Sequence, residues 1–282
     1  MPARRDQAVV LRLSDYSESS QVVTLFSAAH GLVRLIAKGV RRSTRTRVAP
    51  GLDLLELGEL GFLPPTGEAG LGTLTDWMQR DAFDGLRRDA LRLQAGLYAA
   101  ELVMNLTAEL DPHAELFAAL VELLRGLAQR ESPLAAKPPP ASIRGAEDPA
   151  AALLRFQTAL LRAIGYAPNL ERCCVCGKAR MRGAPAYFSS TAGGLVCRDC
   201  EPQQVEKRRV SPRLIDAGDD PQLRAEWFDL LNYHLTHMAG KRFRTAERLH
   251  KLLRQRASPP AAASGRAIGL GSGRPPPATP AG

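Results

Sequence analysis

The chain has 282 residues, which is enough for a sizeable core and for two domains. Its 38 lysines and arginines exceed its 29 aspartates and glutamates, and the resulting formal charge of +9 favours polyanionic partners. No apolar run approaches the roughly 18 residues of a membrane span, and no signal-peptide core follows Arg4 and Arg5. We therefore expect a cytoplasmic protein without membrane contact, whose thiols stay reduced.

Short apolar or alternating runs fill the first 80 residues. The five runs are 8–13, 22–26, 32–37, 52–60 and 71–77. Turn residues such as His30-Gly31 and Pro50-Gly51 separate them, and no connection is long enough for a crossover helix. We therefore predict a small antiparallel barrel as domain 1–80, of the OB type in preference to the SH3-like type because the chain is basic.

Helical periodicity replaces this pattern from residue 81 onward. Leucines recur every three or four positions through 81–130, and Asp111-Pro112 starts a second helix within that stretch. The Pro-rich segment 131–149 is predicted to be an exposed linker. Further helices are predicted at 151–165 and 221–238, followed by a basic helix ending near residue 256.

These patterns predict an α+β protein. The OB-type barrel is followed by an α-helical domain at 81–256, and that domain carries a cysteine knuckle at 173–200. The Ala-, Pro- and Gly-rich tail 257–282 cannot supply a core, so we expect it to be disordered.

All five cysteines lie between residues 173 and 200, in the sequences CCVCG and CRDC. Two CxxC pairs about twenty residues apart have the spacing of a structural four-thiolate zinc site, which closes the metal shell and leaves no position for substrate. The predicted ligands of one Zn²⁺ are Cys173, Cys176, Cys197 and Cys200. Paired disulfides or a redox CxxC remain alternatives, although a redox motif would not need a second pair. Cys174 leaves the ligand choice open within the first pair.

Two clusters of cations predict nucleic-acid contacts. Residues 21–52 contain no carboxylate but include Arg34, Lys38, Arg41, Arg42, Arg45 and Arg47. A second basic run at 241–256 begins with Lys241, Arg242 and Arg244. Such side chains displace the counterions of a sugar-phosphate backbone, and neighbouring hydroxyls donate to phosphate oxygens. The alternative is a solvated loop that only aids solubility.

No catalytic motif is present, so we predict no enzymatic activity. Aromatic residues make up only 5% of the chain, which favours phosphate contacts over base stacking and predicts binding that is sequence-tolerant and weakened by salt. His234 and His237 share a helix face, but nothing nearby completes a metal site, so we expect them to be packing or surface residues.

Four segments together resemble the RecO family of bacterial DNA repair proteins across residues 7–256. They begin AVVLRLSDYSESS, LLRAIGYAPNLERCCVCG, GGLVCRDC and YHLTHMAGKRFRTAERL. The resemblance implies an OB domain and a helical domain with a zinc knuckle, where zinc supports the fold. Lys38, Gly39, Arg41 and Arg42 match the family's basic segment. The extra Cys174, the Pro-rich stretch and the long tail depart from the family pattern.

The resemblance also implies a function and partners. Members bind single- and double-stranded DNA, anneal complementary strands and act with RecR, so that the recombinase RecA replaces single-stranded DNA-binding protein on gaps. The acidic, hydrophobic tail of that binding protein docks on the helical domain. This chain would therefore need an apolar groove bordered by Arg or Lys.

Two other classes of protein stay open at this point. A zinc-ribbon nucleic-acid-processing enzyme would need clustered carboxylates for Mg²⁺, and the nearest candidates are Asp216, Asp219 and Asp220 in a Gly-containing loop. An OB-fold RNA-binding factor would instead prefer RNA to DNA of equal length.

Overall fold

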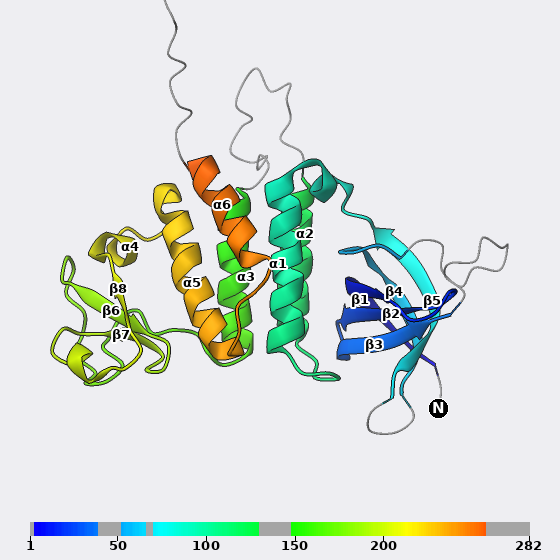
Figure 1. The fold of residues 1–282 in the computed structure, drawn as a ribbon, viewed down its shortest axis with the longest axis horizontal. Coiled ribbons are helices and arrows are strands. Elements are labelled where there is room, and N and C mark those ends of the chain that lie inside the picture. The colour runs from blue at the N-terminus through cyan, green and yellow to red at the C-terminus, as the bar shows by residue number, and fades with distance from the viewer. Residues whose placement is uncertain (1–2, 39–51, 66–69, 130–147, 258–282) are drawn as a thin grey trace, which may run out of the picture.

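The computed structural model describes residues 3–38, 52–65, 70–129 and 148–257. Along its long axis a barrel, a helical body and a small cysteine lobe follow one another (Figure 1). The barrel contains β1 (Arg4–Asp15), β2 (Gln21–Ser27), β3 (Gly31–Ala37), β4 (Leu57–Leu63) and β5 (Gly72–Asp81). The helical body contains α1 (Ala90–Leu106), α2 (Ala114–Ala128), α3 (Pro149–Ala163), α5 (Arg224–Ala239) and α6 (Ala246–Ala257).

The cysteine lobe, residues 169–217, is built on a three-stranded sheet of order β7-β6-β8. Its elements are β6 (Ala186–Ser189), β7 (Gly194–Val196), β8 (Arg208–Val210) and the short helix α4 (Pro212–Asp216). The sequence patterns did not predict this sheet, because its strands are only three or four residues long. In the described ranges, three 3₁₀ turns complete the elements: Asp84–Arg88, Glu201–Gln203 and Pro221–Leu223.

The strand order of the closed barrel is β1-β2-β3-β5-β4, and the long β1 pairs with both β2 and β4. This arrangement confirms the predicted OB-type barrel. One pairing differs from the antiparallel prediction, because β3 and β5 run parallel at Leu35–Gly72 and Ile36–Thr73. A parallel contact between strands distant in sequence leaves no mark on the alternation of either strand.

The fourth predicted run, 52–60, is only partly a strand. Residues 54–55 form a turn, and β4 begins at Leu57. Leu55 adopts a left-handed backbone conformation with φ 66° and is nevertheless fully buried. This apolar residue is therefore buried although it lies in a turn, and it does not extend the strand.

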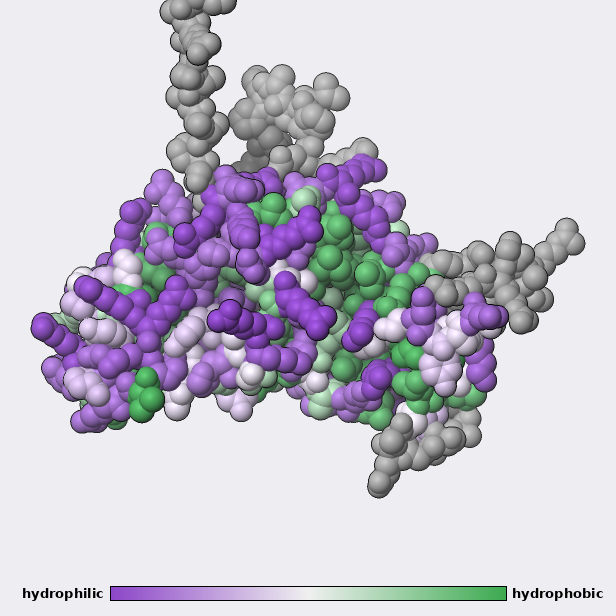
Figure 2. Space-filling model, viewed as in Figure 1, coloured by the Kyte–Doolittle hydropathy of each residue, from purple (hydrophilic) through white to green (hydrophobic). Residues whose placement is uncertain are grey.

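One apolar cluster joins the barrel to the helices. It contains Val9 and Phe26 from the outside of the barrel together with Tyr98 and Leu124 from the helical body. A separate cluster fills the barrel interior. Figure 2 shows hydrophobic residues gathered on this face where the helices meet the barrel. The division at residue 80 stays a prediction, and the segments 131–147 and 258–282 lie outside the described residues.

The helix boundaries follow local capping chemistry. Asp89 caps α1 by accepting from the Arg92 amide, and Asp148 caps α3 with Pro149 in the first position. The helix predicted at 151–165 is thus α3, shifted by two residues. Gly240, with φ 63°, ends α5 in the left-handed conformation that glycine favours.

The hairpin between β2 and β3 fastens the barrel to the connection between α1 and α2. The Leu110 amide donates to the Leu32 carbonyl at 2.9 Å. Beside it, Gly31 has φ 67°, and a Cβ there would lie 2.0 Å from the Asp111 carbonyl oxygen. Glycine is required at residue 31 both by its backbone conformation and by this close approach.

We predict that Gly31→Ala lowers the free energy of unfolding by about 2–4 kcal/mol, because it combines a left-handed Cβ with overpacking. The control is Gly165→Ala, which has φ 78° but no atom within 4 Å of the added Cβ, and should cost only about 1–2 kcal/mol. Urea unfolding of both variants measures the difference. Equal losses would show that the contact with Asp111 contributes nothing.

Candidate metal centre and nucleic-acid interface

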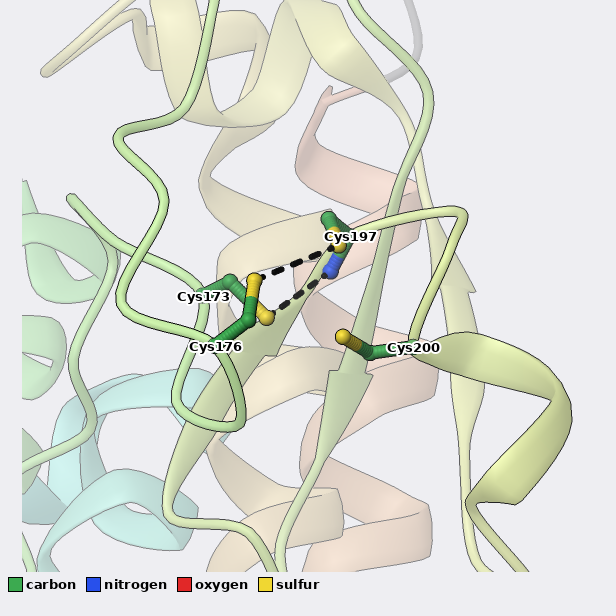
Figure 3. Close-up of side chains that lie close together, drawn as sticks. All are labelled: Cys173, Cys176, Cys197 and Cys200. Carbon is green, nitrogen blue, oxygen red and sulfur yellow. Dashed lines mark hydrogen bonds between the residues drawn. The ribbon is translucent and has the colours of Figure 1, made fainter.

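Two tight turns bring the cysteine pairs together. The Gly177 amide donates to the Cys173 carbonyl at 2.9 Å, and Gly177 has φ 73°, so the chain reverses directly after the first pair. The second pair follows the end of β7, where the Cys200 amide donates to the Cys197 carbonyl at 3.2 Å. In Figure 3 the four thiols converge from these two turns.

The geometry of the four thiols fits a tetrahedral metal ion. The Sγ atoms of Cys173, Cys176, Cys197 and Cys200 all lie within 4.8 Å of one another. Those of Cys176 and Cys197 are 3.8 Å apart. Four sulfurs at about 2.3 Å from a tetrahedral ion would be about 3.8 Å from each other. The four predicted ligands can therefore hold a metal ion.

The protonation of this cluster also suits a cation. Burial opposes ionisation of Cys173, but backbone N–H groups, including those of Cys176 and Cys197, outweigh it and lower the pKa of its thiol to about 6. Hydrogen bonding to Cys197, with burial and the nearby Cys173 thiolate, raises the pKa of Cys200 to about 12. A thiolate among protonated neighbours is a starting point for metal binding, because a bound cation displaces the remaining protons.

Cys174 lies outside the cluster of four. Its amide donates to the Leu195 carbonyl at 2.8 Å, which ties this residue to β7. Burial and the adjacent Cys173 thiolate raise the pKa of its thiol. The described geometry therefore groups Cys173 and Cys176, and not Cys174, with the downstream pair, and the choice of ligands stays a prediction.

The two histidines on α5 are packing and surface residues, as expected. His234 is buried, its ring lies edge-on to Phe188, and its Nε2 is 2.9 Å from the Tyr166 carbonyl oxygen. Burial lowers its pKa, which favours the neutral ring. The exposed His237 instead faces the Thr191 hydroxyl at 3.3 Å.

The acidic residues considered for Mg²⁺ each contact an arginine. Asp216 pairs with Arg180, Asp219 with Arg224 and Asp220 with Arg213. Within the described residues, the grouped metal-ligating side chains are the four cysteines. The structure therefore gives no support to a carboxylate metal site in this loop.

The first basic cluster is described only in part. Arg34 is exposed on β3 and pairs with Glu109 at 3.3 Å, and Lys38 is exposed just after that strand. The other four predicted contacts, Arg41, Arg42, Arg45 and Arg47, lie outside the described residues. An exposed pair such as Arg34–Glu109 is weak, so a phosphate could displace the carboxylate.

The second basic cluster lies on the connection between α5 and α6. The side chains of Lys241, Arg242 and Arg244 are exposed. Glu101 of α1 fixes the backbone of this connection, because its carboxylate accepts hydrogen bonds from the amides of Arg244 and Thr245 at 2.8 and 2.9 Å. The backbone is thus fixed while the three cations stay in solvent.

Sequence reasoning missed the anchoring role of Glu101. Its sequence signal is an acid in an apolar helix with no basic residue three or four positions away, which indicates a partner distant in sequence. The contact also places the second basic cluster at the same end of the helical body as the pair between Arg34 and Glu109. Glu101 holds the second cluster, and Glu109, eight residues later, pairs with Arg34, so the two anchor points lie within about 20 Å.

In Figure 1 both anchor points lie at the lower end of the helices, where α1 leads into α2 and α5 into α6.

None of the helices in the described ranges is both long and apolar enough to cross a membrane.

Comparisons with known proteins agree with this architecture. The family profile "Recombination protein O N terminal" matches residues 1–83, and "Recombination protein O C terminal" matches 87–137 and 142–244. A DNA repair protein RecO from Rhodopirellula baltica is 34% identical over 221 residues, covering 77% of this chain and 75% of that protein.

Two further relatives cover more of the chain. The DNA repair protein RecO of Myxococcus xanthus is 30% identical, over 86% of this chain and 95% of its own length. That of Pelotomaculum thermopropionicum is 32% identical, over 90% and 88%. Both profiles and relatives extend across the barrel and the helical body, and the chain belongs to the RecO family of DNA repair proteins.

Proposed function

We propose that this chain is a recombination mediator without enzymatic activity. It binds single- and double-stranded DNA, anneals complementary strands and, with RecR, helps to load RecA onto gaps covered by single-stranded DNA-binding protein. The observation that supports the proposal is that Arg34, paired with Glu109, and the second basic cluster, held by Glu101, lie at one end of the helical body. Family membership supplies the repair context.

The proposed mechanism is electrostatic. Two strands that anneal must bring their phosphates together, and cations on the protein reduce this repulsion while raising the local concentration of each strand. Because the residues that hold Arg34 and the second basic cluster lie within about 20 Å of each other, cations beside each of them would let one protein contact two backbones at once. No covalent bond changes in this process.

We propose that the ion held by the four cysteines is Zn²⁺. Tetrahedral four-thiolate coordination suits zinc, and reduced cytoplasmic thiols keep the ligands available. Cys173, Cys176, Cys197 and Cys200 would fill the shell and leave no open position. The ion would therefore stabilise the cysteine lobe and take no part in annealing.

A groove between α2 and α3 is our candidate site for the acidic tail of single-stranded DNA-binding protein. It has a volume of about 430 Å³, with Leu123, Leu154 and Phe156 among its lining. Arg155 and Arg162 also line it and are exposed, so cations border an apolar floor. Glu122 is the acidic residue of the lining and would repel the acidic tail locally.

The DNA proposal predicts that two double variants, Arg41→Ala/Arg42→Ala and Lys241→Ala/Arg242→Ala, each bind single-stranded DNA about tenfold more weakly near 0.1 M salt and anneal more slowly. Each should also reduce the slope of log affinity against log salt concentration by about 1.4. The loss of two phosphate contacts means that fewer counterions are released on binding. Fluorescence anisotropy at several salt concentrations gives both quantities.

The matched control for these variants is Arg80→Ala/Arg213→Ala, which removes the same charge from residues already paired with Glu59 and Asp220. It should leave the salt slope nearly unchanged. Equal effects of all three variants would show that DNA affinity depends on net charge alone and not on these particular residues. A strong preference for RNA of equal length would favour the RNA-binding alternative.

The metal proposal predicts that Cys197→Ser lowers the zinc content from one ion per chain to nearly none and reduces the solubility and thermal stability of the protein, because the metal shell opens. Cys174→Ser should keep one zinc. Elemental analysis and thermal unfolding test both. Normal folding of a metal-free Cys197→Ser protein would disprove the supporting role of zinc, and metal loss in Cys174→Ser would disprove the ligand assignment.

The groove proposal predicts that Ala159→Glu, on the groove lining, weakens binding of a peptide with the tail sequence of the cognate single-stranded DNA-binding protein at least tenfold, because it buries a carboxylate against an acidic ligand. Ala118→Glu on the exposed side of α2 is the control and should bind normally. Titration calorimetry measures both affinities. Unchanged binding in Ala159→Glu would place the tail elsewhere.

A further inference from the structure

An aromatic ring at the lower end of the helical body is left in solvent. All eight phenylalanines of the chain are buried. Among the phenylalanines, tyrosines and tryptophans of the described ranges, only Tyr16 and Tyr166 are exposed, by 61% and 54%. Tyr166 lies three residues after the end of α3, and in Figure 1 the chain leaves α3 at the end of the helical body where α5 leads into α6.

The backbone of Tyr166 is fixed from two sides. Its amide donates to the Leu161 carbonyl at 2.7 Å. The preceding amide, of Gly165, donates to the Arg162 carbonyl at 3.1 Å, which completes the Schellman pattern of a helix C-terminus. On the other side, the Tyr166 carbonyl oxygen lies 2.9 Å from Nε2 of His234, which is only 1% exposed. Because α3 and α5 already hold this backbone, a ligand on the ring loses little free energy to ordering it.

The second basic cluster lies close to this ring. His234 precedes Gly240, the end of α5, by six residues, or about 9 Å along the helix axis, and Lys241 and Arg242 follow at once. The backbone of Tyr166 is therefore on the order of 15 Å from the cluster, within the span of a few nucleotides. A strand bound to these cations would bring its bases near the ring.

The immediate surroundings of Tyr166 also suit a polyanion. Residues 162–170 contain one cation, the exposed Arg162, and no carboxylate. Glu206 acts electrostatically on His234, but its carboxylate already accepts hydrogen bonds from the hydroxyls of Ser189 and Tyr233.

The other exposed ring lies in a less suitable place. Tyr16 belongs to the turn between β1 and β2, where the exposed carboxylates of Asp15 and Glu18 flank it and would repel phosphates. Tyr166 is thus the exposed ring that combines a fixed backbone with neighbouring cations.

We propose that Tyr166 stacks on an unpaired base of single-stranded DNA whose phosphates contact the second basic cluster. This inference rests on the proposed function and adds to it a residue that distinguishes single strands from duplexes. The bases of a duplex cover each other's faces, whereas an unpaired base of any kind offers its face to a ring. A base on Tyr166 leaves the ring when it pairs, so the contact holds the unpaired strand and is absent from the annealed product.

The test compares the full-length parent with Tyr166→Ala and Tyr166→Phe by fluorescence anisotropy at about 0.1 M salt. The probes are a twelve-residue oligothymidylate, an abasic oligomer with the same backbone, and a twelve-base-pair duplex. Tyr166→Ala should bind the oligothymidylate about tenfold more weakly and the other two probes at parental affinity, because only the first offers an unpaired base. Tyr166→Phe keeps the ring and should bind all three probes as the parent does.

A matched control and a direct measurement locate the contact. Tyr16→Ala removes the other exposed ring and should bind the oligothymidylate normally. An oligothymidylate that carries 5-iododeoxyuridine should cross-link to Tyr166 of the unaltered parent under ultraviolet light, with the site identified by mass spectrometry. The cross-link keeps the test valid even if Tyr166→Ala does not fold.

Four results would overturn the assignment of Tyr166. They are parental affinity of Tyr166→Ala for the oligothymidylate, equal losses on the oligothymidylate and the abasic oligomer, equal losses in Tyr16→Ala and Tyr166→Ala, and no cross-link at residue 166. A parent that binds neither oligomer would instead contradict the proposed function itself.

Discussion

The shared apolar cluster between barrel and helices is the constraint on which the rest of the molecule depends. Val9 and Phe26 lie on the outside of the barrel yet are fully buried, because α1 and α2 cover them. Separating the two parts would expose this surface at a cost of about 25 cal/mol for each Å². The barrel therefore cannot swing freely, and the distance between Arg34 and the second basic cluster is a property of the fold.

The cysteine lobe is stabilised differently. Its own apolar cluster is small and includes two residues from outside the lobe: Leu223, just before α5, and Leu230, within α5. Sheets of three short strands bury too little surface to be stable alone, and a metal ion is a usual supplement. The Arg180–Asp216 pair adds a second tie across the lobe. The same pair leaves Nη1 of Arg180 buried and, in the described part of the protein, without a hydrogen-bond partner.

Local patterns in the sequence predicted what short-range chemistry determines. The CxxC turns, the ends of α3 and α5, and four of the five barrel strands follow from glycines, caps and alternation within a few residues. Contacts between distant segments could not be predicted in this way. The parallel β3–β5 pair, the burial of Leu55 from a turn, and the contact of Glu101 with Thr245 each depend on residues far apart in the chain.

The carboxylate of Glu101 at the start of α6 has a consequence for how a nucleic acid would move on this surface. It lies at the electropositive end of that helix and accepts from the amides of Arg244 and Thr245, so a phosphate would be repelled from these two amides. The exposed side chains of Lys241, Arg242 and Arg244 lie beside this helix end and would be the groups that meet a strand there. On the proposed function, contacts through long side chains would let a bound strand shift along the protein, as two strands must while they search for their matching alignment.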